Sequence, residues 1–165
     1  MKLKKSTYEE QQSFLEREPI RPKSRRDMRS LAFHFVYATD RFDYTVPLEE
    51  IIENFKEGFV VELDNDALAV TMARGTIETR EKTDEQVKPL LRNWRLERLG
   101  CCTRLILRLA LWELQQKDSV PSIVINEAVE LAKCFAEKDA YKFINGILDE
   151  ASKKMEQTPS TVRPE

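Results

Sequence analysis

The chain has few of the residues that metal sites, disulfide frameworks and phosphate-binding loops depend on. It contains four glycines, three cysteines and one histidine among its 165 residues. So few glycines disfavour a turn-rich all-β chain and glycine loops that cradle phosphate. Cys101, Cys102 and Cys134 form no C-x-x-C pair, and one histidine does not complete a familiar zinc set. We therefore expect no metal, no cofactor and reduced cysteines, as in a cytoplasmic protein.

Long apolar runs and enzyme motifs are missing from the sequence as well. The most apolar stretch, residues 105–114, is interrupted by Arg108 and Glu113 and is too short to span a membrane. The charged N-terminus lacks the apolar run of a signal peptide. Nucleotide-binding glycine loops, the H-E-x-x-H helix and the G-x-S-x-G turn are absent. His34 is the sole candidate general base, and a partly buried helix histidine is the better interpretation. We expect neither an enzyme nor a membrane protein.

Charge is plentiful and unevenly placed. Charged residues make up 34% of the chain and hydrophobic residues 41%, which suits one globular domain with a full core. Between Arg21 and Arg29, five basic residues stand against one acid, Asp27, while the chain as a whole carries a net charge of −2. A basic patch on an acidic body can steer one anionic partner without general adhesion to anions.

Apolar residues recur at helical spacing through most of the chain, and no strand pattern of useful length competes with them. The periodicity predicts an all-α fold, a compact bundle of about six or seven helices within residues 23–155. Residues 1–22 and 156–165 are expected to be tails, the first of them flexible, with a short helix over 8–17 as an alternative for part of it. The expected helices begin near Ser24, Pro47, Asp66, Cys102, Pro121 and Asp139.

The basic cluster is the main functional signal that the chemistry alone provides. Arg25, Arg26 and Arg29 lie at the start of the first expected helix, and positions 25 and 29 share a face. Guanidinium groups suit phosphate because they present a planar fork of donors, and the helix N-terminus adds partial positive charge. A solvated charge run remains an alternative on these grounds.

Aromatic residues near this cluster could convert phosphate attraction into RNA binding. Exposed rings stack on single-stranded bases, at about 1–3 kcal/mol each. Tyr37 follows Arg29 by eight residues, so it is displaced by only about 80° around the helix. Tyr141 and Phe143 flank Lys142 near the start of the last helix. Periodicity alone favours core packing for Tyr37 and Phe143.

Several motifs occur in an order that is typical of one family. Residues 125–133 read INEAVELAK and residues 142–149 read KFINGILD, and both place asparagine inside a regular helical pattern. Upstream, residues 106–114 read ILRLALWEL and residues 25–29 read RRDMR. Together they resemble the NusB family of small, all-helical RNA-binding factors of transcription antitermination.

The resemblance implies a function and partners. Members pair with NusE, a ribosomal protein, and bind boxA-type single-stranded RNA in the transcription elongation complex, which promotes read-through of ribosomal RNA operons. A homodimer is a further expectation. By resemblance, the RNA-binding residues would be Lys23, Arg25, Arg26, Arg29, Tyr37, Lys142 and Phe143. Partner-binding residues would be Thr103 and Arg104. The signature residues Asn126, Glu127 and Asn145 would bond between helices or to backbone ends, and Gly146 would permit close helix packing.

Departures from the family pattern leave two alternatives open. Asp27 falls inside the arginine motif and should weaken RNA affinity, and Thr103 stands where an acidic residue is common. One alternative is a protein-only helical adaptor or dimerisation module. The other is the NusB-like domain of a ribosomal RNA methyltransferase.

If RNA engages all five cations, log K should fall with log salt at a slope of about −3.5. Replacing Arg25 and Arg29 by alanine should then leave melting intact, since both side chains are expected outside the core.

Overall fold

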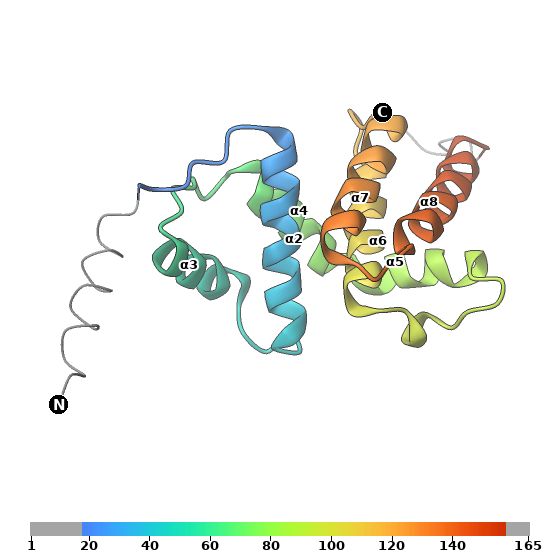
Figure 1. Cartoon of the computed structure of the whole chain (residues 1–165), viewed down its shortest axis with the longest axis horizontal. Helices are drawn as coiled ribbons and strands as arrows, with labels where there is room; N and C mark the ends of the chain where they lie inside the picture. The colour runs from blue at the N-terminus through green and yellow to red at the C-terminus, as the bar shows by residue number, and fades with distance from the viewer. Residues whose placement is uncertain (1–17, 158–165) are drawn as a thin grey trace, which may run out of the picture.

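The computed structural model describes residues 18–157, which form a bundle of seven α-helices (Figure 1). The helices are α2 Arg25–Arg41, α3 Leu48–Phe59, α4 Leu68–Glu78, α5 Arg80–Val87, α6 Cys101–Leu114, α7 Pro121–Phe135 and α8 Ala140–Gln157, with 3₁₀ turns η1 Lys88–Leu90 and η2 Leu96–Arg98. The all-α prediction is confirmed. Within the described range no strand forms, and no helix is long and apolar enough to cross a membrane.

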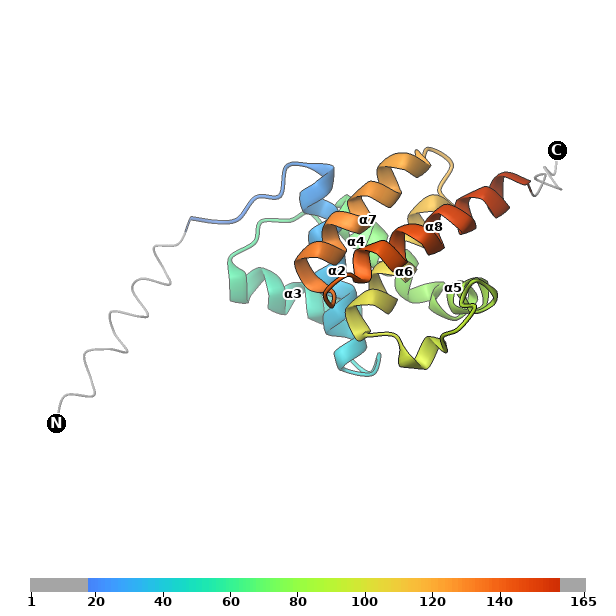
Figure 2. The same cartoon turned by 45° about the vertical axis from the view of Figure 1, so that its right-hand side comes forward.

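Helix α6 is the centre of the bundle. It packs against α2, α4, α5, α7 and α8, so it is surrounded by other helices, as its apolar sequence predicts. Leucines and isoleucines on all its faces are buried, namely Leu105, Ile106, Leu107, Leu109 and Leu111. Helices α2 and α3 lie on one side of α6 and α5 and α8 on the other, while α7 packs on α6 and also contacts α2 (Figures 1 and 2). The position of α6 thereby fixes where α2 and α7 meet.

Helix α4 approaches α6 closely at a glycine. A Cβ atom built on Gly75 would overlap the indole ring of Trp112. The absence of a side chain at Gly75 therefore allows the large Trp112 ring to lie between the two helices.

The start of α2 is fixed by a reciprocal cap. The Ser24 hydroxyl accepts a hydrogen bond from the backbone N–H of Asp27, and the Asp27 carboxylate accepts one from the N–H of Ser24. This capping box satisfies two donors that the first turn would otherwise leave unpaired. The prediction of Ser24 as N-cap is confirmed, and the box sets the position of the arginines that follow.

The expected tails are shorter than predicted. The backbone N–H of Ile20 donates to the carbonyl of Val60, and the N–H of Glu62 donates to the carbonyl of Ile20. Residues 18–22 therefore lie along the chain that follows α3, and the tail prediction is wrong for them. Helix α8 likewise extends to Gln157, two residues into the expected C-terminal tail. The short helix expected over residues 8–17 lies outside the described part of the chain.

Candidate nucleic-acid interface

Arg29 is buried between three helices. Its side chain is 8% exposed, and its Nη2 and Nε atoms donate to the Glu113 carboxylate of α6 at 2.6 and 2.9 Å. Its Nη1 atom also lies 4.0 Å from the Glu127 carboxylate of α7. The expectation that Arg29 lies outside the core is wrong, because its position on α2 faces the junction with α6 and α7. Its guanidinium holds these helices together.

Arg26 joins α2 to α7 at the edge of the same junction. Its Nη2 and Nε atoms donate to the two oxygens of Glu127 at 2.7 and 3.0 Å. These hydrogen bonds, with the charge of Arg26, hold the pKa of Glu127 below its usual range. Glu127 therefore forms hydrogen bonds between α7 and α2, as expected for this signature residue. The Arg26 side chain remains 66% exposed, so its guanidinium still reaches solvent.

Lys23 and Arg25 are the unpaired cations of the cluster. Both side chains are exposed, and neither forms an ion pair or hydrogen bond with any residue in the range 18–157. Arg21, by contrast, is paired with Glu62 through bonds of 2.6 and 3.0 Å. Three of the five cations are thus matched by carboxylates, and the local field is weaker than the sequence suggests.

Asp27 has a structural reason to stand among the arginines. Its carboxylate accepts hydrogen bonds from the backbone N–H groups of Ser24 and Lys23, at 3.0 and 3.2 Å. Those bonds hold the pKa of Asp27 below its ordinary value. The acid thus serves the helix cap, although it also reduces the positive charge at this end of α2.

Exposed aromatic rings lie further along α2, on the side where Arg26 contacts α7. Tyr37 is 40% exposed, so the periodicity-based expectation of core packing is wrong for it. Its ring lies 6.2 Å from that of Phe33, which stacks at 5.0 Å on Phe135 at the end of α7. Phe135 is itself 38% exposed. Sequence reasoning missed Phe135, because helical spacing does not distinguish an apolar residue at a helix end from one in the core.

The start of α8 adds a cation and a partly buried ring. Lys142 is exposed and lies 3.3 Å from the Asp139 carboxylate, with its ammonium 5.8 Å from the ring centre of Tyr141. Phe143 is partly buried and packs against the core, as periodicity suggests. The cation Lys142 thus stands at the surface beside one aromatic ring.

These features form one continuous strip. Helix α7 runs beside α2, because Arg26 in the first turn of α2 meets Glu127 in the second turn of α7, and Phe33 meets Phe135 further along. Helix α8 begins five residues after Phe135. From Arg25 to Tyr37 the strip is about 18 Å long, at 1.5 Å per helical residue. We call it the α2–α7 strip; cations lie at one end and exposed rings at the other.

Thr103 is not available to a partner. It is 3% exposed, and its hydroxyl donates to the Glu137 carboxylate at 2.7 Å, which ties the α7–α8 connection to α6. The expected partner role is therefore wrong for Thr103. Arg104 is partly exposed and lies 3.8 Å from Asp40, and its buried Nε atom has no hydrogen-bond partner within residues 18–157.

The signature residues other than Glu127 lie on the surface. Asn126 and Asn145 are exposed, and neither side chain forms a hydrogen bond with the residues described. A Cβ built on Gly146 would meet no atom within 4 Å. The expectation that these three residues serve internal bonding or close packing is wrong, since all face outward from α7 and α8.

The fold and the strip define a class of protein, a small helical bundle with a basic and aromatic surface suited to single-stranded nucleic acid. The NusB family model matches residues 26–153. The chain belongs to the NusB family.

Curated and solved relatives agree with this assignment. The chain is 39% identical over 125 residues to the transcription antitermination protein NusB of Staphylococcus haemolyticus, covering 76% of this chain and 96% of that protein. It is 37% identical to the Geotalea uraniireducens protein over 134 residues, covering 77% and 92%.

Solved structures show the same fold. That of T. maritima NusB aligns with a TM-score of 0.70 at 32% identity, covering 80% of this chain and 92% of that chain. A structure of the antitermination factors NusB and NusE with double-stranded RNA aligns with a TM-score of 0.67 at 25% identity, covering 79% and 96%.

Proposed function

We propose that the protein is an RNA-binding transcription antitermination factor without catalytic activity, acting in the cytoplasm. With NusE, it binds boxA-type single-stranded RNA in the elongation complex and promotes read-through of ribosomal RNA operons. The observation that carries the proposal is the α2–α7 strip, where the unpaired cations Lys23 and Arg25 lie at the start of α2 and exposed rings follow further along the same helix. The NusB relatives, and the NusB–NusE complex with RNA that shares the fold, support it.

Phosphates would bind at the start of α2. Lys23 and Arg25 are exposed and have no carboxylate partner in the described part of the chain, and the helix N-terminus adds partial positive charge. Arg26 would add a weaker contact because Glu127 already holds two of its donors. Arg29 would act by keeping α2 in place against α6. With two or three cations engaged, we expect a salt slope of about −1.4 to −2, shallower than the −3.5 expected for five.

Bases would bind at the other end of the strip. Tyr37 and Phe135 expose ring surface, and stacking on such rings tolerates any base sequence. Lys142, with Phe143 beside it, would lie next to these rings at the start of α8. This arrangement places the phosphate contacts and the stacking contacts about 18 Å apart, the length of a few nucleotides.

Binding of a short boxA-like RNA to wild type and Arg25→Ala tests the proposal. We expect the variant to bind several-fold more weakly and to have a salt slope smaller by about 0.7, since one phosphate contact is removed. Arg92→Ala is the matched control, because Arg92 is 81% exposed outside the strip. Equal losses in both variants, or in neither, would refute a specific role for the start of α2.

A protein-only adaptor is the second candidate. The pairing of Arg21, Arg26 and Arg29 with carboxylates favours it, because it reduces attraction for a polyanion. Failure of wild type to bind RNA at low salt, with NusE still bound, would support this alternative.

A further inference from the structure

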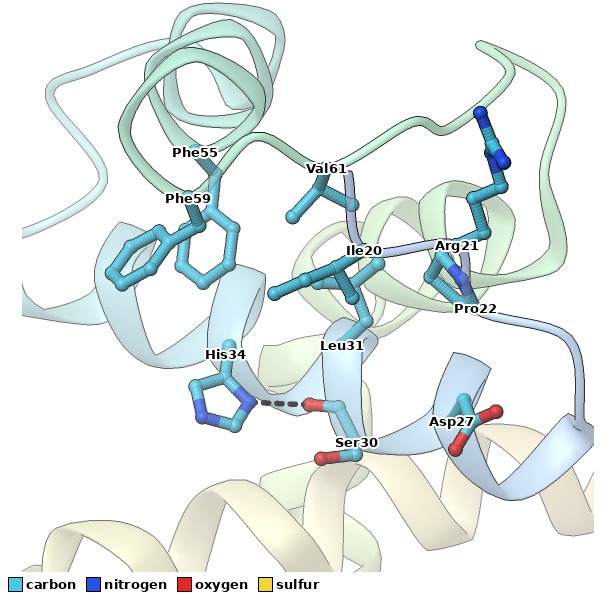
Figure 3. A pocket seen from close by; sticks show the side chains of 10 residues that line it. All are labelled: Ile20, Arg21, Pro22, Asp27, Ser30, Leu31, His34, Phe55, Phe59 and Val61. Carbon is cyan, nitrogen blue, oxygen red and sulfur yellow. Dashed lines mark hydrogen bonds between the residues drawn. The ribbon is translucent and has the colours of Figure 1, made fainter. Parts of the chain in front are cut away.

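A largely apolar groove of about 590 Å³ lies between α2, α3 and the segment before α2 (Figure 3). Phe55 and Phe59 of α3 form one wall, with ring centres 4.5 Å apart. Leu31 of α2 and Val61 also line it. Phe59 is 56% exposed as a residue, which leaves part of its side chain open to a ligand.

The α2 side of the groove carries polar groups. Asp27, Ser30 and His34 lie along it, opposite the two phenylalanines (Figure 3). The Nδ1 atom of His34 lies 2.6 Å from the carbonyl oxygen of Ser30, so Nδ1 donates that bond. The Nε2 atom has no hydrogen-bond partner among the described residues and remains available to a ligand.

An exposed cation, Lys23, directly follows residues 20–22, which line the groove. The backbone N–H of Lys23 donates to Asp27, which lines the groove, while the exposed Lys23 side chain has no partner among residues 18–157. In contrast, the guanidinium of Arg21 extends away from the groove (Figure 3) and pairs with Glu62.

Aromatic contacts connect the groove to the α2–α7 strip. The His34 ring lies 6.1 Å from Phe55 in the groove and 5.1 Å from Phe135 on α7, edge-on to both. Phe135 in turn stacks on Phe33, which contacts Tyr37. Ring contacts therefore run without interruption from Phe59, across α2, to Tyr37.

We propose that this groove binds one unpaired base of the RNA, stacked on Phe59 with its polar edge toward His34 and Ser30. The inference rests on the proposed function and extends its site across α2. Its volume lies within the range of small-molecule sites, its walls are apolar, and polar groups converge on one side, as a nucleobase requires. Lys23 would hold the phosphate next to that base. The continuous rings favour RNA over an apolar protein segment as the occupant.

The experiment uses the full chain and a boxA-like RNA in which 2-aminopurine replaces one base at a time. In wild type, we expect stacking to quench the fluorescence at one position. Phe59→Ala should restore that signal and weaken binding about five- to hundred-fold, the loss that one stacked base implies. Phe42→Ala is the matched control, since Phe42 is 54% exposed at the opposite end of α2. Phe59→Leu retains apolar volume without a ring, so it should restore the fluorescence even if the alanine variant melts early.

The outcomes separate this inference from the proposed function. If RNA binding depends on Arg25 while both Phe59 variants bind and quench as wild type, the base site is refuted and the function stands. If the Phe59 variants lose affinity for NusE alone, the groove belongs to a protein and the base site is also refuted. If wild type binds no RNA at low salt, both fail.

Discussion

Replacing Arg29 by alanine should destabilise the fold, whereas replacing Arg25 should leave stability unchanged. The two arginines lie one helical turn apart, and the sequence pattern alone does not distinguish their roles. The Arg29 side chain is 8% exposed and bonded to Glu113, while Arg25 is exposed and pairs with none of the residues that the structure describes. The expectation that both substitutions leave melting intact is therefore wrong for Arg29.

The magnitude follows from what the substitution leaves behind. Truncating Arg29 strands the Glu113 carboxylate, whose side chain is 17% exposed, in a largely dry junction. Breaking such a pair by removing one partner costs about 3 kcal/mol, the lower end of the range because Glu113 retains some water contact. For a chain of this size that corresponds to a drop in Tm of about 10 °C. Arg25→Ala should change the unfolding free energy by less than about 0.5 kcal/mol.

Urea denaturation followed by circular dichroism gives both free energies. A third variant, Arg29→Met with Glu113→Leu, removes both charges and should recover most of the lost stability, because apolar replacement of a buried pair is often neutral. An Arg29→Ala protein as stable as wild type would refute the buried-pair account. A double variant as unstable as Arg29→Ala would show that the loss comes from packing instead of the stranded carboxylate.

Two further predictions concern local packing and pH. Gly75→Ala should destabilise the fold by about 1–3 kcal/mol in urea denaturation, because its Cβ would overlap Trp112. Gly146→Ala should be neutral or stabilising, since no described atom lies within 4 Å of the added Cβ. Equal effects of the two substitutions would contradict the close approach at Gly75. Asp27→Asn should destabilise the fold at neutral pH, because hydrogen bonds from Ser24 and Lys23 lower the pKa of Asp27 in the folded protein. The ionised Asp27 therefore contributes to folding stability above its unfolded pKa, and this contribution is lost as the pH falls through the folded pKa. Melting curves of both proteins should therefore converge in acid, and a constant difference at all pH values would refute this linkage.

Helix positions were predictable where local signals are strong. The Ser24 cap and the apolar character of α6 depend on neighbours within a few residues, so the sequence was sufficient for them. The family was predictable for a related reason, since its motifs are short and contiguous.

The state of the arginines was not predictable from local pattern. The carboxylate that covers Arg29 comes from α6, 84 residues further along, and the one that holds Arg26 comes 101 residues further. Only the packing of α2 against α6 and α7 decides which arginine is buried. Sequence spacing showed a cluster of cations and could not show that its members have different roles.

The surface position of the signature residues was missed for a similar reason. Asn126, Asn145 and Gly146 sit within regular apolar patterns, which favoured an internal role. Which face of α7 and α8 is covered depends on how these helices pack on each other and on α6. The groove beside Phe59 was likewise invisible, because it is built from three separate segments of the chain.

The central claim is that the α2–α7 strip binds boxA-type RNA, and binding across a range of salt concentrations tests it most directly. Purified protein would be titrated against a labelled boxA-like RNA, with and without NusE. We predict salt-sensitive binding with a slope of about −1.4 to −2 that tightens when NusE is present. Absence of RNA binding under both conditions, even at low salt, would contradict the claim.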